Sequence, residues 1–243
     1  MVRVLKATSA ALLLAMGLAA PVAAGPFEDG VAAYQRLDYA AAMRFVRPLA
    51  EKGSARAQVY VGSMYAHGQG VAQNVPEGMK WLQRATSQGD AYAQFQRGNL
   101  HKLGLVVPRD NAEALKWYRL AAAQGYAPAL YNLGLMYQEG RGVPQDHAEA
   151  AKWYRLAIDS DFTEPDFNYR ANAQLKLGRQ YADGQGVPQD YLLAYMWLDL
   201  SAAQKTLGAD IFRQEVSSRL TPAQLAEAKR LAQEWKPAAQ PSK

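Results

Sequence analysis

The chain has 243 residues, of which 49% are apolar, 20% are charged and none is cysteine. This is the composition of an ordered protein, and the lack of cysteine excludes disulfides, thiolate metal sites, cysteine catalysis and a lipid-modified cysteine. The formal net charge of +5 is too small to predict nucleic-acid binding without a concentrated basic patch. No apolar run reaches the roughly 20 residues that span a bilayer, so we expect no stable membrane insertion.

Residues 1–24 have the pattern of a signal peptide. Arg3 and Lys6 precede a run of apolar and small residues, and Val22-Ala23-Ala24 places small residues where a signal peptidase cleaves. We therefore expect cleavage after Ala24 and export, to the periplasm or to the medium. A retained N-terminal anchor is the alternative.

A 36-residue repeat fills most of the remaining chain. Trp81, Trp117 and Trp153 are spaced by 36 residues, and Trp197 follows after 44. Four glycines repeat the same steps: Gly62, Gly98, Gly134 and Gly178. This agreement predicts four units that begin at Ala55, Ala91, Ala127 and Ala171, called here the first to fourth units.

Each unit is predicted to contain two helices. In the third unit Leu130, Leu133, Gly134 and Tyr137 share one helical face. A Gly-x-Gly-Val loop follows, and the second helix begins at a residue with capping spacing to a glutamate. These pairs are Asn74 with Glu77, Asp110 with Glu113, and Asp146 with Glu149. The second helix should bury a tryptophan and a tyrosine, such as Trp153 and Tyr154.

The predicted fold class is all-α, with no strand. A single helix pair cannot bury both apolar faces, so the pairs should stack as an α-solenoid. Two further helices over residues 206–236 are expected to cap the solenoid of residues 25–205, with Thr221 and Gln224 forming a capping box. Residues 237–243 are expected to form a mobile tail.

The run from Ala127 to Ala157, which contains Tyr-Asn-Leu-Gly-Leu-Met-Tyr, Gly-Arg-Gly-Val-Pro-Gln-Asp and Ala-Lys-Trp-Tyr-Arg-Leu-Ala, resembles a Sel1-like repeat. The resemblance covers roughly Phe27 to Ser201 and includes a leading half-unit, Phe27 to Gly53. It implies antiparallel helix pairs in a right-handed superhelix whose first helices line a concave surface. It also implies a role as an adaptor or regulator in the bacterial envelope.

Carrying over the family's concave positions predicts a protein-binding groove. Its residues are Arg56, Val59, Ser63, Tyr92, Phe95, Asn99, Lys102, Tyr131, Leu135, Asn172, Leu175 and Arg179, with Pro128 and Gln138 in the same register. Aromatic, basic and amide groups without a carboxylate suit an extended peptide or helix of some acidic character. Alternatively, Phe95, Tyr131 and Leu175 pack on neighbouring helices.

The second unit departs from the others. Arg97 replaces Val61, Leu133 and Leu177, His101 replaces a tyrosine, and Val106 replaces the second loop glycine. Arg97 and His101 share a helical face and predict a contact to a carboxylate or phosphate. The alternative is a substituted core position, with Arg97 extending to the surface or pairing with an acid.

An insertion of eight residues between Ala157 and Ala171 carries several acidic and aromatic residues. It predicts a longer second helix and turn, with a partner contact or a loose Ca²⁺ site as alternatives. No His-Glu-x-x-His, Gly-x-Ser-x-Gly, Ser-x-x-Lys or phosphate-loop pattern occurs. We therefore predict no cofactor or metal, and a non-enzymatic scaffold, adaptor or regulator that binds another envelope protein or peptide. A cell-wall or β-lactam-directed hydrolase and a peptidoglycan-binding protein are the alternatives.

Overall fold

The computed structural model describes residues 25–160 and 168–237, and within these ranges the chain forms twelve helices and no strand. Five helix pairs are formed: α1 (Pro26–Gln35) with α2 (Tyr39–Glu51), α3 (Ala55–His67) with α4 (Val75–Ser87), α5 (Ala91–Leu103) with α6 (Asn111–Ala122), α7 (Ala127–Glu139) with α8 (His147–Asp159), and α9 (Tyr169–Asp183) with α10 (Tyr191–Ala203). The last two helices, α11 (Ala209–Ser217) and α12 (Pro222–Glu234), both pack on α10. The all-α solenoid is confirmed.

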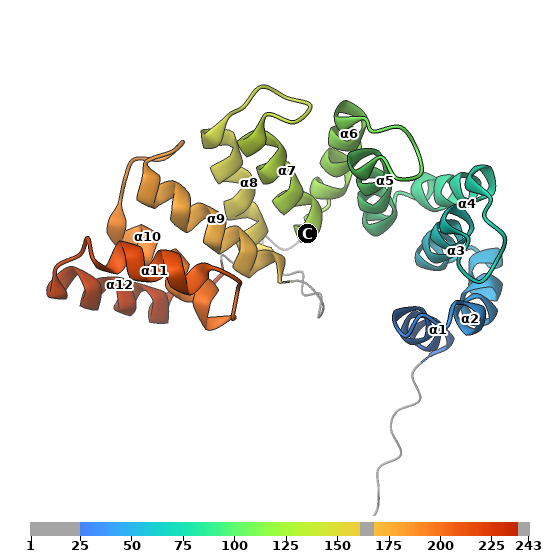
Figure 1. Ribbon diagram of the computed structural model, residues 1–243, viewed down its shortest axis with the longest axis horizontal. Coiled ribbons are helices and arrows are strands. Elements are labelled where there is room, and N and C mark those ends of the chain that lie inside the picture. Colours follow the sequence, from blue (N-terminus) through green and yellow to red (C-terminus); the bar gives the residue numbers. More distant parts are fainter. Residues whose placement is uncertain (1–24, 161–167, 238–243) are drawn as a thin grey trace, which may run out of the picture.

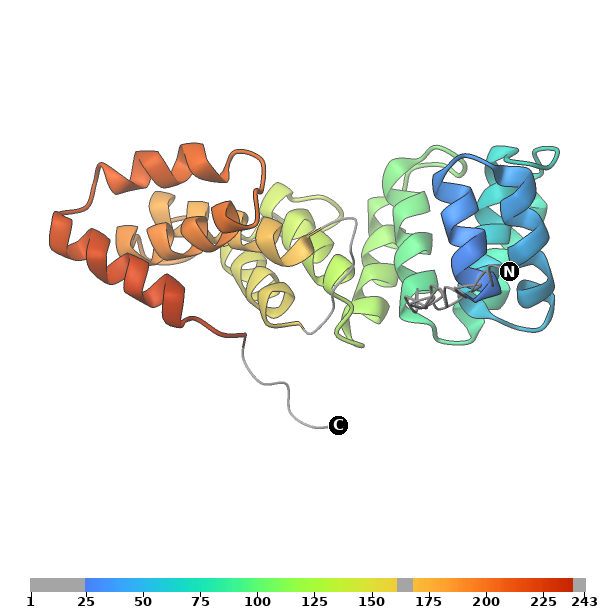
Figure 2. The ribbon, with the colours of Figure 1, turned by 90° about the horizontal axis from the view of Figure 1, so that it is seen from below.

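The pairs follow one another along an arc (Figure 1). Helices α1, α3, α5 and α9 lie on the inner side of this arc, and α2, α4, α6 and α10 lie on its outer side. Figure 2 shows the two ends of the solenoid, with α1 at one end and α11 and α12 at the other. The inner surface is therefore built mainly from the first helix of each unit.

Glycine allows the two helices of a unit to approach closely. A Cβ atom on Gly62 would lie 2.8 Å from the carbonyl oxygen of Gly78 on the facing helix. In the third unit, a Cβ atom on Gly134 would overlap the ring of Tyr154. The tryptophans contribute less than expected to this packing, because Trp117 and Trp153 are only half-buried while Tyr118 and Tyr154 are fully buried.

The second helices begin with half of the predicted capping arrangement. The side chains of Asn74, Asp110 and Asp146 each accept a hydrogen bond from the backbone N–H three residues later. The glutamates do not return a bond to the cap, because the cap N–H groups donate to carbonyl groups of the preceding helix. Glu113 instead accepts hydrogen bonds from Lys116 and Trp117. The complete capping box at Thr221 is confirmed.

The loop within a unit packs on the preceding unit through its second glycine. Gly142 has φ +75°, and a Cβ atom there would lie 2.7 Å from the carbonyl oxygen of Asn111, at the start of α6. Gly70 and Gly186 approach the starts of α2 and α8 in the same way. Val106 occupies this position in the second unit.

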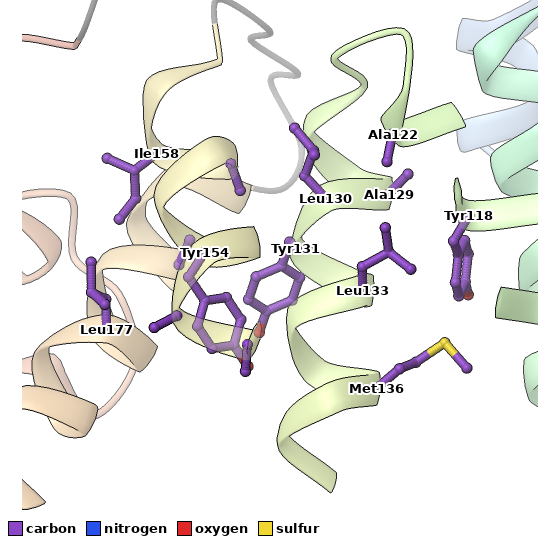
Figure 3. Close-up of a cluster of buried hydrophobic side chains, with 14 of the residues drawn as sticks. Tyr118, Ala122, Ala129, Leu130, Tyr131, Leu133, Met136, Tyr154, Ile158 and Leu177 are labelled. Carbon is purple, nitrogen blue, oxygen red and sulfur yellow. The ribbon is translucent and has the colours of Figure 1, made fainter. Parts of the chain in front are cut away.

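The buried apolar side chains fall into two larger clusters, and a small third cluster of Val59, Leu82, Ala85 and Ala93 joins α3, α4 and α5 between them. One large cluster of buried apolar side chains extends from Phe95 in α5 to Ala228 in α12. Figure 3 shows its centre, where Leu133 and Met136 of α7 face Tyr118 and where Tyr131 lies beside Tyr154 of α8. A separate cluster covers α1 to α4. Contact between α4 and α5 is sparser than between α2 and α3, α6 and α7, or α8 and α9.

Two details differ from the sequence predictions. The leading segment is a complete helix pair with a short first helix of 10 residues, not a half-unit. The insertion does not lengthen the second helix, because α8 has the same 13 residues as α4, whereas α9 has 15. Most of the insertion, the signal peptide and all but the first residue of the predicted tail lie outside the described residues.

The last two helices lie where a terminal cap was expected. Trp235, which follows α12, packs edge-on against Trp197 of α10, with 5.6 Å between ring centroids. Arg213 of α11 pairs with Asp199 of α10, its Nη1 lying 2.8 Å from the Asp199 carboxylate. Both contacts place the added helices against the fourth unit.

Candidate functional site

A cavity of about 320 Å³ lies where α3, α4 and α5 meet. The first helices α3 and α5 contribute residues from equivalent repeat positions, and Gly78, Met79 and Leu82 of α4 complete the lining. The equivalent pairs are Ser63 with Asn99, Tyr60 with Gln96, and His67 with Leu103. The cavity therefore opens between two neighbouring units, at the junction where contact between α4 and α5 is sparse.

Aromatic rings form one wall of the cavity. Tyr60 and Tyr92 are stacked, with 6.4 Å between ring centroids and 22° between ring planes. Tyr34 of α1 meets the edge of Tyr60. The Arg56 guanidinium lies 5.7 Å from the Tyr92 ring centroid, so a cation borders this wall.

Amide groups form the polar part of the lining. Asn99 donates from Nδ2 to Gln96 Oε1 at 3.0 Å, and its Oδ1 accepts from the Tyr118 hydroxyl at 2.7 Å. Burial raises the pKa of Tyr118, so this hydroxyl keeps its proton and fixes the orientation of the amide. Among the residues that the structure describes, none with a carboxylate lines the cavity. The site thus offers apolar surface with a few oriented amide groups.

Two exposed leucines lie at the edge of the cavity. Leu103 is 58% exposed and Leu105 is 75% exposed, and both line the cavity. The equivalent residues of the third unit are Glu139 and Arg141, and those of the fourth unit are Asp183 and Gln185. Folding does not require apolar residues at these positions, since three other units have polar ones there.

The structure brings only some of the predicted groove residues together. Val59, Ser63, Tyr92 and Asn99 line the cavity. Phe95 and Tyr131 are buried, with 6% and 8% exposure, and their rings pack against Tyr118 and Tyr154, as the packing alternative expects. The remaining predicted residues lie elsewhere on the first helices: Arg56 and Arg179 are exposed, and Lys102, Leu135, Asn172 and Leu175 are half-buried.

The cavity lining includes predicted positions and adds neighbouring ones. The prediction stepped from Arg56 to Val59 and Ser63, whereas Tyr60 and Gln96 also face the cavity and were missed. A step of four residues in place of three would have found them. The apolar pair Leu103 and Leu105, polar in the other units, was a second available signal.

Lys102 lies beyond the cavity, toward α7. Its ammonium group donates to Asn132 Oδ1 at 2.5 Å. Burial lowers the pKa of Lys102, and Glu139 partly opposes that effect. Lys102 therefore contributes a partly desolvated cation to the inner surface.

Arg97 occupies a core position. Its guanidinium lies 4.2 Å from the Trp117 ring centroid and donates weakly to Thr86 Oγ1 at 3.4 Å. Burial lowers the pKa of Arg97. Its Nε and the Nδ1 of His101 are buried without a hydrogen bond. This geometry fits the substituted-core alternative with a stacked cation, and the predicted anion contact stays a prediction.

Within residues 25–160 and 168–237 no group of three or more His, Asp or Glu side chains is placed to hold a metal ion. None of the helices described for this chain is long and apolar enough to cross a membrane.

Fold and site together define an α-solenoid of 36-residue helix pairs with an apolar cavity between two first helices. The Sel1 repeat family model matches residues 55–90, 91–126, 127–162 and 171–205, which is more than half of the chain. The chain therefore belongs to the Sel1 repeat family. Such proteins generally mediate protein–protein interactions and are typically non-enzymatic scaffolds.

Two solved structures are similar to this chain. One is c5321, a protective antigen present in uropathogenic Escherichia coli strains and displaying an SLR fold, with 32% identity over 86% of this chain and a TM-score of 0.68. The other is a Sel1 repeat protein from Oxalobacter formigenes, with 33% identity over 74% of this chain and a TM-score of 0.63. The matches cover 44% and 50% of those chains, so this chain spans about half of their length. A search of curated proteins found no match.

Proposed function

We propose that the protein is a non-enzymatic scaffold, adaptor or regulator of the bacterial cell envelope that binds another protein or peptide on the inner surface of the arc. The observation that carries this proposal is the cavity between α3 and α5 with its exposed leucines, Leu103 and Leu105. Exposed apolar surface beside a concave, amide-bearing pocket is typical of protein-recognition sites. The interaction role of Sel1 repeats supports the same assignment.

The envelope part of the proposal is supported by the N-terminal sequence. Arg3, Lys6, the apolar run and Ala24 form the pattern of an exported protein. Fractionation of the organism that encodes the protein tests this part. We expect a periplasmic product that lacks residues 1–24, and an uncleaved cytoplasmic product would contradict it.

Site-specific photo-crosslinking tests the binding surface. A photo-reactive amino acid replaces Ser63 or Gln96 in the cavity, and Lys152 on the exposed side of α8 serves as the matched control. In cells of the encoding organism we expect a discrete protein adduct from the two cavity positions and none from Lys152. Adducts from Lys152 alone would place the partner on the outer surface. Pelleting with purified sacculi in the absence of any protein adduct would favour the peptidoglycan-binding alternative.

A further inference from the structure

We propose that the cavity between α3 and α5 receives one bulky apolar side chain, leucine or aromatic, from an acidic segment of the partner protein. This inference rests on the proposed function and names the kind of segment that the same site recognises.

The cavity is large enough to accept an anchoring side chain, and its lining is mainly apolar. Its volume of about 320 Å³ lies at the lower end of the range for ligand pockets, about 300–1,000 Å³. Val59, Leu82 and Leu100 supply aliphatic surface, and the Tyr60 and Tyr92 rings supply aromatic surface. Apolar anchors seated in pockets dominate the energy of protein interfaces.

Substitutions specific to the second unit accompany the cavity. At the junctions of α6 with α7 and of α8 with α9, Leu133 and Leu177 are fully buried, whereas Arg97 occupies the equivalent position of α5 and packs on Trp117. Val106 stands where the other three units have a glycine that lies close to the preceding second helix. The cavity thus lies at the unit whose sequence departs from the repeat.

The exposed leucines extend the apolar surface beyond the cavity. Leu103 and Leu105 lie at its edge, and both are apolar only in the second unit. A side chain seated in the cavity would bring its own backbone against these leucines and remove them from water. The Gln96 and Asn99 amides lie in the same lining, where they can exchange hydrogen bonds with that backbone.

Charge favours an acidic segment. Neither α3 nor α5 contains Asp or Glu, whereas the two helices carry Arg56 and Lys102, besides Arg97, whose guanidinium packs on Trp117. Arg56 borders the aromatic wall, and Lys102 lies on the α7 side of the cavity. The carboxylates of the next first helices, Glu139 and Asp183, lie at the ends of α7 and α9. Complementary charge would steer an acidic segment to this half of the arc.

Random 12-residue peptides displayed on phage are the probe. We expect selection on the purified protein to enrich peptides that combine a leucine or aromatic residue with several Asp or Glu residues. We expect synthetic copies of these peptides to bind the Ser63→Phe variant at least about tenfold more weakly than they bind the wild type, because the phenylalanine ring fills the cavity. The double variant Leu103→Gln, Leu105→Gln and the charge variant Arg56→Glu should also bind more weakly. Leu120→Gln is the matched control, since Leu120 is 49% exposed and lies outside the cavity lining.

Circular dichroism and thermal unfolding establish that each variant is folded. The exposed-leucine variant keeps the test valid if Ser63→Phe unfolds the protein. Enrichment of basic peptides, no enrichment, or equal binding to wild type and the folded cavity variants would each overturn the inference. Crosslinks from Ser63 or Gln96 would still support the proposed function in those cases. Conversely, peptides that meet the expectation without any crosslinked protein would leave the inference standing and count against the proposed function.

Discussion

The junction between α4 and α5 and the junction between α6 and α7 hold the same place in consecutive repeats, yet contact between α4 and α5 is sparser than contact between α6 and α7. Leu133 of α7 faces Tyr118 across a continuous core (Figure 3), whereas its counterpart Arg97 stacks on Trp117. Gly142 lies against the start of α6, whereas its counterpart in the second unit is Val106. Two substitutions thus accompany the change from a sealed interface to one with a cavity.

Transferring the arginine to the sealed junction should have the largest effect. Leu133 is 0% exposed, so Leu133→Arg would bury an unpaired cation. We expect the free energy of unfolding to fall by about 3–5 kcal/mol, measured by urea denaturation. A loss below 1 kcal/mol would mean that any unit tolerates arginine here, and the contrast between the junctions would disappear.

Alkaline pH should weaken the closely packed region next. Burial raises the pKa of Tyr131 to about 12, and also raises the pKa of Tyr118 and Tyr154. Above pH 10 the unfolded chain releases these protons while the folded chain retains them, so stability is intact below pH 10 and falls above it. Each tyrosine should cost about 1.4 kcal/mol by pH 11.

Urea denaturation at pH 9 and pH 11 measures this loss, and Tyr131→Phe should reduce it. An unchanged pH dependence in that variant would show that Tyr131 does not contribute.

Removing the arginine from the open junction should stabilise the protein. Arg97→Leu replaces a desolvated cation, whose Nε lacks a hydrogen bond, by the side chain found in the third and fourth units. We expect a gain of about 1–2 kcal/mol in the free energy of unfolding, measured as above. A loss would show that the stacking of Arg97 on Trp117 outweighs the cost of burying it. Intact partner binding in this variant would also exclude the predicted anion contact.

The smallest effect is expected at the edge of the cavity. Leu105 is 75% exposed, so Leu105→Gln should change the free energy of unfolding by less than about 0.5 kcal/mol. A loss above 1 kcal/mol would mean that Leu105 supports the fold and is not primarily a binding residue. Differential scanning calorimetry of this variant beside Leu120→Gln checks the expectation.

The repeat made the fold readable from the sequence. The spacing of Trp81, Trp117 and Trp153 placed every described helix pair of the four units, because each unit contacts mainly its neighbours. The cavity was harder to predict, because its lining uses neighbouring positions of each first helix, Tyr60 as well as Val59. The sequence did mark Arg97 and Val106 as unusual. Their effect on packing between units became visible only in three dimensions.

The sparse contact between α4 and α5 also has a mechanical consequence. A force that pulls on the two ends of the solenoid acts on every interface between neighbouring units. The interface with the fewest packing contacts separates first. Here that interface lies between α4 and α5, where contact is sparsest among the adjoining second and first helices and only a small buried cluster joins the two halves. Stretching would therefore widen the cavity before it disturbed any other helix pair. Tension would therefore weaken the binding of a side chain in the cavity, and a bound side chain would resist the separation of the two helices.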